Sequence, residues 1–177
     1  MSYRLNPGLV QLYTGTGKGK STAAVGLGMR AVGHGLRVFL LQFMKGDPEY
    51  GELLSLASVE GFDTLQSGLP TFVKKGEPGA EDLRLAAAGY EKAREIIAAG
   101  WYDLVILDEI NVAVDYGLLT VEQALALIDL KPAHVELVLT GRYAPPELVE
   151  RADLVSEVTE IRHPYAAGVA ARKGIEF

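Results

Sequence analysis

The segment from Thr14 to Thr22, TGTGKGKST, constrains this chain more than any other. It matches the phosphate-binding pattern G-x-x-x-x-G-K-[ST] at Gly19, Lys20 and Ser21, with Thr14 in place of the first glycine. Glycines let successive backbone N–H groups point into one concavity, and a helix that begins near Ser21 adds free N–H groups and the positive end of its dipole. The segment therefore predicts a loop that binds phosphate, with Lys20 reaching phosphate oxygens and the Ser21 hydroxyl available to Mg²⁺.

The residues on either side of this loop favour nucleotide binding. Residues 9–13 are predicted to form a buried strand and residues 21–32 a helix, so that strand, loop and helix follow one another in the required order. The alternative is a glycine-rich turn before a helix that merely begins with a Ser or Thr cap. The order of the three elements supports the first interpretation.

The composition is that of an ordinary globular protein. The 177 residues are 49% hydrophobic and 23% charged, which suits one domain spanning residues 1–177. The formal net charge of −6 disfavours nonspecific binding to nucleic acid or to anionic membranes. The absence of cysteine excludes disulfides, thiolate metal sites and cysteine nucleophiles, and no apolar run is long enough to span a membrane. We therefore expect a cytoplasmic protein with neither a nucleic-acid nor a membrane partner.

Strand-like and helix-like segments alternate, which predicts an α/β fold with a mostly parallel central sheet and helices on both faces. The predicted strands are 9–13, 36–43, 62–65, 103–109, 135–139 and 154–161. The predicted helices are 21–32, 51–58, 80–99, 120–128 and 145–152. In the longest helix, apolar residues that recur every three or four positions predict one buried face, formed by Leu83, Ala86, Tyr90, Ala93 and Ile97.

A second nucleotide element is predicted where the apolar run 104–107 ends in Asp108 and Glu109. Open parallel sheets bind their ligands at the carboxyl ends of the strands, where these two carboxylates would emerge. One of them can hold Mg²⁺ directly or through water, while the other positions a reactant or serves as a second metal ligand. The sequence leaves open which residue takes which role. Many strands end in an acidic residue, so this pair indicates a nucleotide site only in combination with the preceding phosphate loop.

Seven short motifs occur in a fixed order along the chain. They are Tyr13–Ala24, Arg30–Gly35, Gln42–Gly46, Leu107–Glu109, Thr140–Arg142, His163–Val169 and Gly174–Phe177. Taken in this order, they resemble the motifs of the ATP:corrinoid adenosyltransferases of the cobalamin pathway. The resemblance extends from Leu9 to Phe177, and the departure at Thr14 is itself typical of that family. Any one motif would be unspecific, whereas the ordered set is specific.

This resemblance implies a RecA-like P-loop fold in a homodimer. In the implied reaction, the cobalt(I) of a corrinoid attacks the 5′ carbon of ATP, an adenosylated corrinoid such as adenosylcobalamin forms, and tripolyphosphate leaves. The triphosphate would lie in the loop in the reverse sense to kinases. An electron-donating flavoprotein reductase is the implied source of cobalt(I).

The resemblance also implies a set of site residues. The nucleotide-binding residues of the loop would be Gly15, Thr16, Gly17, Lys18, Gly19, Lys20, Ser21 and Thr22. Ser21 with Asp108 or Glu109 would hold Mg²⁺, which neutralises charge on the leaving group. Lys20, Ser21 and Glu109 are the predicted catalytic residues, and their work is positioning and charge stabilisation.

Four further residues are predicted to contact the nucleotide or the corrinoid. Lys45 and Arg142 follow strand ends and are placed to reach the nucleotide, although solvated surface cations are the alternative. His163 lies in a tail motif, where a structural role is the alternative. Many family members carry a Gly-Phe-Thr-Trp-like patch after the third strand, credited with displacing the lower cobalt ligand. Here residues 68–72 offer only Phe72, which is therefore the predicted corrinoid contact.

Two other functions are compatible with a phosphate-binding loop. A small-molecule kinase would transfer the γ-phosphoryl group, but it usually has a mobile basic lid, and the sequence has no arginine-rich segment of that kind. A nucleotide-dependent switch ATPase would use hydrolysis to change an interface. The products separate the three functions: tripolyphosphate, ADP with a phosphorylated substrate, or ADP with free phosphate.

Overall fold

The computed structural model describes residues 5–176, so Phe177 of the last motif lies outside the described residues. Six strands form one sheet in which every pair of neighbours is parallel. The strands are β1 (Val10–Thr14), β2 (Val38–Phe43), β3 (Phe62–Ser67), β4 (Leu104–Asp108), β5 (Glu136–Thr140) and β6 (Leu154–Glu157). The helices are α1 (Lys20–Val32), α2 (Gly51–Leu56), α3 (Ala80–Ala99), α4 (Ile110–Asp115), α5 (Val121–Asp129), α6 (Pro146–Arg151) and the 3₁₀ turn η1 (Pro164–Ala167).

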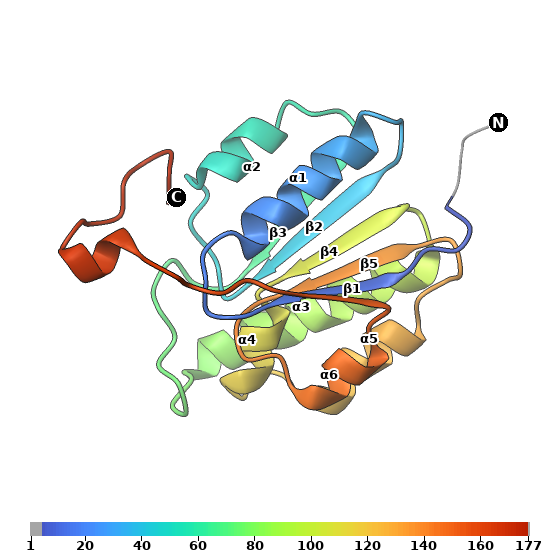
Figure 1. The fold of residues 1–177 in the computed structure, drawn as a ribbon. Helices are drawn as coiled ribbons and strands as arrows, with labels where there is room; N and C mark the ends of the chain where they lie inside the picture. Colours follow the sequence, from blue (N-terminus) through green and yellow to red (C-terminus); the bar gives the residue numbers. More distant parts are fainter. Residues whose placement is uncertain (1–4, 177) are drawn as a thin grey trace.

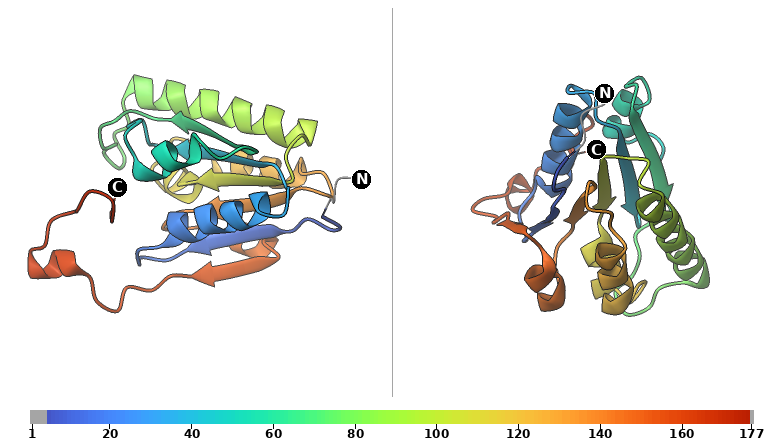
Figure 2. Two further views of the ribbon diagram at one scale, coloured as in Figure 1. Left: turned by 90° about the horizontal axis from the view of Figure 1, so that it is seen from above. Right: turned by 90° about the vertical axis from the view of Figure 1, so that its right-hand side faces the viewer.

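Helices cover both faces of the sheet, as Figures 1 and 2 show. On one face, α3 to α6 bury side chains such as Ile97 and Leu127 against the strands. On the other face, α1 and α2 bury Ala24 and Leu56. Strands β2 and β4 are buried along their whole length, because both of their faces are covered. This burial explains why they occur in the sequence as continuous apolar runs.

The strand order is β3-β2-β4-β5-β1-β6. Strand β5 therefore lies between β1, which leads into the phosphate loop, and β4, which ends in Asp108. This order is consistent with the RecA-like fold that the resemblance implied. Because all strands are parallel, their carboxyl ends meet at one edge of the sheet, where Thr14, Phe43, Asp108 and Thr140 end their strands.

The structure confirms the predicted α/β class with helices on both faces, and all neighbouring strands of its sheet are parallel. Details of single elements differ from the prediction. Helix α4, which begins directly after Glu109, was not predicted, because its six residues are too short to show helical periodicity. Leu83 is exposed and was wrongly placed on the buried face of α3, because that helix packs on the sheet only from Ala86 onward. Strand β3 extends to Ser67, and β6 ends at Glu157.

Beyond β6 the chain leaves the sheet. Residues 159–176, named here the C-terminal arm, run outward, form η1 and turn back toward the carboxyl ends of the strands (Figure 1, red). Nearly all side chains of this arm are exposed. In the part of the chain that the structure describes, no helix has both the length and the apolarity needed to cross a membrane.

Candidate active site

The loop after β1 is shaped by two glycines and by Lys20. Gly15 and Gly19 have φ angles of 95° and 122°, which residues with side chains rarely adopt. Lys20 begins α1 and folds back, so that its Nζ donates to the carbonyls of Gly15 at 2.8 Å and Gly17 at 2.6 Å. Burial lowers the pKa of Lys20, and the nearby Glu109 carboxylate partly opposes this effect. The Lys20 ammonium therefore lies against the loop, close to the backbone that is predicted to surround phosphate.

The middle of the loop is braced against the exit of β6. The Gly17 N–H donates to the Val158 carbonyl at 2.7 Å. A Cβ on Gly17 would lie only 2.8 Å from the carbonyl carbon of Thr159, so no larger residue fits without a backbone shift. The loop and the start of the C-terminal arm are thus in direct contact.

Asp108, at the end of β4, is almost fully buried, and both of its carboxylate oxygens accept hydrogen bonds. Its two carboxylate oxygens accept from the Thr140 hydroxyl at 2.7 Å and from Lys45 Nζ at 2.8 Å. Burial alone would raise the pKa of Asp108, but Lys45 and the hydroxyls of Thr140 and Ser21 more than offset it and hold that pKa below its usual range. Lys45 has a raised pKa in turn, because the Asp108 charge outweighs the effect of its own burial. Asp108 and Lys45 therefore form a charged pair behind the loop.

Glu109 follows in a left-handed conformation with φ of 62°. Its N–H donates to Thr140 Oγ1 at 3.1 Å, so the same hydroxyl serves both acidic residues. The turn directs the Glu109 side chain into a cavity, whereas Asp108 stays behind the cavity wall. Burial and the adjacent Asp108 charge raise the pKa of Glu109.

A buried amide extends the polar network toward α2. Gln42, on β2, is fully buried, and its Nε2 donates to Glu52 at 3.1 Å and to Asp108 at 3.3 Å. Gln66 Nε2 donates to Gln42 Oε1 at 3.2 Å. Since the buried side chains of Gln42 and Asp108 both have partners, this network fixes the relative positions of β2, β4 and α2 at this edge.

The turn that carries Arg142 is held from two sides. The Gly141 N–H donates to the Tyr13 carbonyl at 3.1 Å, and Asn111 Nδ2 donates to the Gly141 carbonyl at 3.0 Å. Gly141 has a φ of 131°, and a Cβ there would lie 3.0 Å from the Asn111 Cβ, so glycine is required. The exposed Arg142 that follows this turn lines the cavity.

These elements enclose a cavity of about 520 Å³. Most of the predicted site residues line it: Gly17, Lys18, Gly19, Lys20, Ser21, Thr22, Lys45, Glu109, Arg142 and His163. Val25, Gly51 and Glu52 complete the wall beside α1 and α2, and residues 174–176 of the C-terminal arm close it from outside. The cavity thus combines four cationic side chains with the glycine loop.

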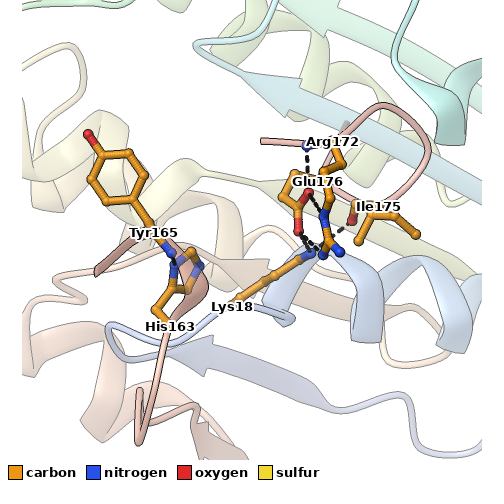
Figure 3. Close-up of polar contacts among 6 residues, drawn as sticks. All are labelled: Lys18, His163, Tyr165, Arg172, Ile175 and Glu176. Atoms are coloured by element: carbon orange, nitrogen blue, oxygen red, sulfur yellow. Dashed lines mark hydrogen bonds and ion pairs between the residues drawn. The ribbon is translucent and has the colours of Figure 1, made fainter. Parts of the chain in front are cut away.

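The arm reaches the cavity through Lys18. Lys18 Nζ donates to the Ile175 carbonyl at 2.8 Å and to Glu176 Oε1 at 3.0 Å (Figure 3). His163 lies at the other end of the arm, where its Nδ1 accepts from the Tyr165 N–H at 3.2 Å and caps η1. The imidazole therefore has a structural contact in addition to its position on the cavity wall.

Some predicted residues are not brought to the cavity wall. Gly15 and Thr16 shape the loop but do not line the cavity, and Asp108 lies behind it. Phe72 lies on the loop between β3 and α3 with its side chain fully exposed, away from the cavity. Its predicted contact with a corrinoid stays a prediction.

Sequence reasoning missed several residues of this site. Thr140 and Gln42 lie at or near the carboxyl ends of β5 and β2, a position that could have signalled them. Glu52 had no local signal, because it lies in a short helix. Glu176 lies in the motif Gly174–Phe177, but nothing in that motif indicated its contact with Lys18. Their place in the site follows from contacts between distant parts of the chain.

The glycine loop favours a polyanion such as a nucleoside triphosphate, since its backbone N–H groups, the N-terminus of α1 and Lys20 face the cavity. Lys18, Lys45 and Arg142 also line this cavity, together with the carboxylates of Glu52, Glu109 and Glu176. A comparison with protein families agrees with this chemistry. Residues 6–177 match the family described as ATP:corrinoid adenosyltransferase BtuR/CobO/CobP. The chain belongs to this family. It is thus a member of an enzyme family of the transferase class, as the order of motifs predicted.

Curated relatives support the membership in the ATP:corrinoid adenosyltransferase family. The corrinoid adenosyltransferase of Pseudomonas aeruginosa is 35% identical over 173 residues, which cover 96% of this chain and 84% of that protein. The corrinoid adenosyltransferase of a Sinorhizobium species is 38% identical over 175 residues, covering 96% and 80%. Corrinoid adenosyltransferase CobA of Salmonella typhimurium is 35% identical over 172 residues, covering 96% and 86%.

Proposed function

We propose that this chain transfers the 5′-deoxyadenosyl group of ATP to the cobalt(I) of a corrinoid and releases tripolyphosphate. The observation that carries the proposal is the cavity itself. It joins a glycine loop, Lys18, Lys20, Lys45 and Arg142 around one space, with Glu109 at its wall. Its volume of about 520 Å³ is within the usual range for small-molecule sites. Family membership supplies the reaction, and the cavity offers a place for the triphosphate.

The charge of the site suits this reaction. When a nucleophile attacks the 5′ carbon, the bond from that carbon to the α-phosphate oxygen breaks and negative charge grows on the leaving tripolyphosphate. Preorganised cations and N–H groups that face the phosphates stabilise this charge without moving. In the proposal, Lys20 exchanges the carbonyls of Gly15 and Gly17 for phosphate oxygens. The protein then acts by positioning the 5′ carbon and holding the leaving group.

The residues present fit a magnesium ion. Ser21 and Glu109 present oxygen ligands to the cavity, and Asp108 lies directly behind them. Among residues 5–176, no group of three or more His, Cys, Asp or Glu side chains forms a metal cage. An ion held by few protein ligands and by substrate phosphates is the usual arrangement for Mg²⁺. Bound there by Ser21 and Glu109, Mg²⁺ would neutralise charge on the leaving group.

Other parts of the proposal rest on the family resemblance or, for the cellular location, on the composition of the chain. The corrinoid is the second substrate, with Phe72 as its predicted contact. A homodimer, a flavoprotein reductase that supplies cobalt(I), a cytoplasmic location and the reversed sense of the triphosphate also belong to the proposal. The first two of these concern partners, and each can be tested separately from the adenosyl transfer.

The decisive experiment is an anaerobic incubation of the protein with Mg²⁺, ATP and chemically reduced cobalamin. We expect the adenosylcobalamin spectrum to grow in step with the release of tripolyphosphate. ADP in place of tripolyphosphate, without a spectral change, would contradict the adenosyl transfer and favour a kinase or a switch ATPase. A preparation that carries Lys20→Ala serves as the control for contaminating activities.

A further inference from the structure

In the described part of the chain, the tip of the C-terminal arm is joined to the rest of the protein by hydrogen bonds from one side chain, that of Lys18. Among the described residues, hydrogen bonds from residues 160–176 to the body of the protein are those from Lys18 to Ile175 and Glu176. The remaining hydrogen bonds of this segment are internal, such as those between Arg172 and Glu176. An exposed segment with so few contacts opens at a low cost in free energy.

The tip itself is a preformed turn. The Ile175 and Glu176 N–H groups donate to the Arg172 carbonyl at 3.1 and 3.0 Å. In return, the Glu176 carboxylate accepts from the Arg172 N–H at 2.7 Å and from its guanidinium at 3.1 and 3.3 Å (Figure 3). Arg172 and Lys18 together lower the pKa of Glu176 to about 2. The carboxylate is therefore ionised at every pH at which the protein would work.

We propose that Glu176 competes with the phosphates of the nucleotide for Lys18, so that it lowers the affinity of the site and is displaced when a polyphosphate binds. The proposal rests on phosphate binding at the loop, which is part of the proposed function. Lys18 is one of the cavity cations, yet Glu176 Oε1 lies 3.0 Å from its Nζ. Glu176 and the Ile175 carbonyl thus take two of the three N–H donors of that ammonium, which a bound phosphate would otherwise use.

Electrostatic repulsion determines whether Lys18 stays bound to the Glu176 carboxylate or binds the polyphosphate. Glu176 lines the same cavity as the loop, so a bound polyphosphate would lie beside a carboxylate of like charge. The loop is braced by Val158 and by Lys20, whereas the arm is exposed and held by Lys18. Repulsion would therefore move the arm and leave the loop in place. Binding would release the Lys18–Glu176 contact. The apparent affinity for polyphosphate would then be the intrinsic affinity multiplied by the fraction of molecules in which that contact is open.

The test measures binding of inorganic tripolyphosphate by titration calorimetry, which requires neither a corrinoid nor turnover. Glu176→Gln is compared with the unchanged protein and with Glu160→Gln, which removes the same charge from an exposed position of the same arm. We expect Glu176→Gln to bind tripolyphosphate about two- to fivefold more tightly, which lies in the upper part of the range for an exposed ion pair. Glu160→Gln should bind like the unchanged protein.

Equal or weaker binding by Glu176→Gln would overturn the proposal, because the arm would then be a lid that contributes contacts to the ligand. An equal gain in Glu160→Gln would also overturn it, since the effect would be one of net charge alone. Absence of binding in all three proteins would contradict phosphate binding at the loop, and with it the proposed function.

Hydrogen exchange gives a second, independent measurement. In the unchanged protein, tripolyphosphate should accelerate exchange of the amides of residues 172–176, because the tip loses its contact with Lys18. Slower exchange of these amides on binding would show that the arm closes over the ligand, and would overturn the proposal.

Discussion

The two walls of the candidate site differ in how they are held. The wall formed by the sheet edge is buried and cross-linked: Asp108, Gln42 and Thr140 are nearly inaccessible, and each has partners from other strands. The outer wall is the C-terminal arm, which is exposed and reaches the cavity through the contact of Lys18 with Glu176. One wall is suited to hold charges in fixed positions, and the other is suited to move.

This difference has a physical origin. Parallel strands with helices on both faces place their carboxyl ends in a dense and water-poor environment, where a polar group without a partner is costly. The arm lies beyond the edge strand β6 and buries little surface, so its position depends on a few charged contacts. Substitutions in the two walls should therefore have different consequences.

The largest effect is expected for Lys20→Ala in the inner wall. The loop would lose its buried cation, and the phosphate charge would lose its main partner. We expect adenosyl transfer to fall by about a thousandfold, as for loss of a key transition-state donor. Turnover assays would measure this loss, with Lys92→Ala on the exposed surface of α3 as a control. Near-normal turnover of Lys20→Ala would contradict the assignment of the site.

Asp108→Asn tests how strongly the inner wall depends on its charged pair. The substitution leaves the Lys45 ammonium beside a neutral amide in a largely buried position. Removal of one partner of a buried pair costs about 3 kcal/mol of stability, so both the free energy of unfolding and the activity should fall. Urea unfolding would measure the free energy of unfolding. The control is Asp129→Asn, which removes an exposed ion pair with Arg151 and should change that free energy by less than about 1 kcal/mol. Similar values for the two variants would remove the contrast between the walls.

Phe72→Ala tests whether an exposed residue contributes to the reaction without contributing to the stability of the fold. Because the Phe72 side chain is fully exposed, the substitution should leave the unfolding free energy unchanged. If it contacts the corrinoid, reaction from cobalt(II) corrinoid under reducing conditions should slow more than reaction from preformed cobalt(I). Trp101→Ala, another exposed aromatic residue, is the control. Equal slowing in the two assays would argue against a role for Phe72 in displacing the lower cobalt ligand.

The smallest effect is expected for Tyr102→Phe, at the end of the sheet opposite to the site. The Tyr102 hydroxyl donates to Asp63 at 2.7 Å, and burial with this contact raises its pKa to about 12. Because the pKa is lower in the unfolded chain, about 10, the hydroxyl stabilises the fold below pH 10 and loses that contribution as the pH rises toward 12. Tyr102→Phe should cost about 1 kcal/mol at pH 7 and flatten the alkaline loss of stability, without changing activity. Unfolding curves between pH 7 and 11 would measure this, and an unchanged alkaline slope would contradict it.

Sequence patterns predicted the inner wall better than the outer one. Strand β1, the loop and α1 follow one another in the chain, so local patterns predicted them together. The Asp108–Glu109 pair was also predicted, because apolar residues of a buried strand precede it. Helix α4 was too short to predict, and the contacts of Thr140 and Gln42 depend on which strands are neighbours. The domain organisation and the roles of the site residues stay predictions.

The sequence by itself determined the α/β class, the phosphate loop and the family, because these depend on residue types at fixed local spacings. Tertiary structure decided which acidic residue faces the cavity: Glu109 lines it, while Asp108 is paired with Lys45 behind the wall. It also decided that Lys18 meets Glu176, a residue 158 positions away. Such contacts depend on the strand order and on the path of the arm, and no local pattern contains that information, because charges distant in the chain are brought together only when the sheet has formed.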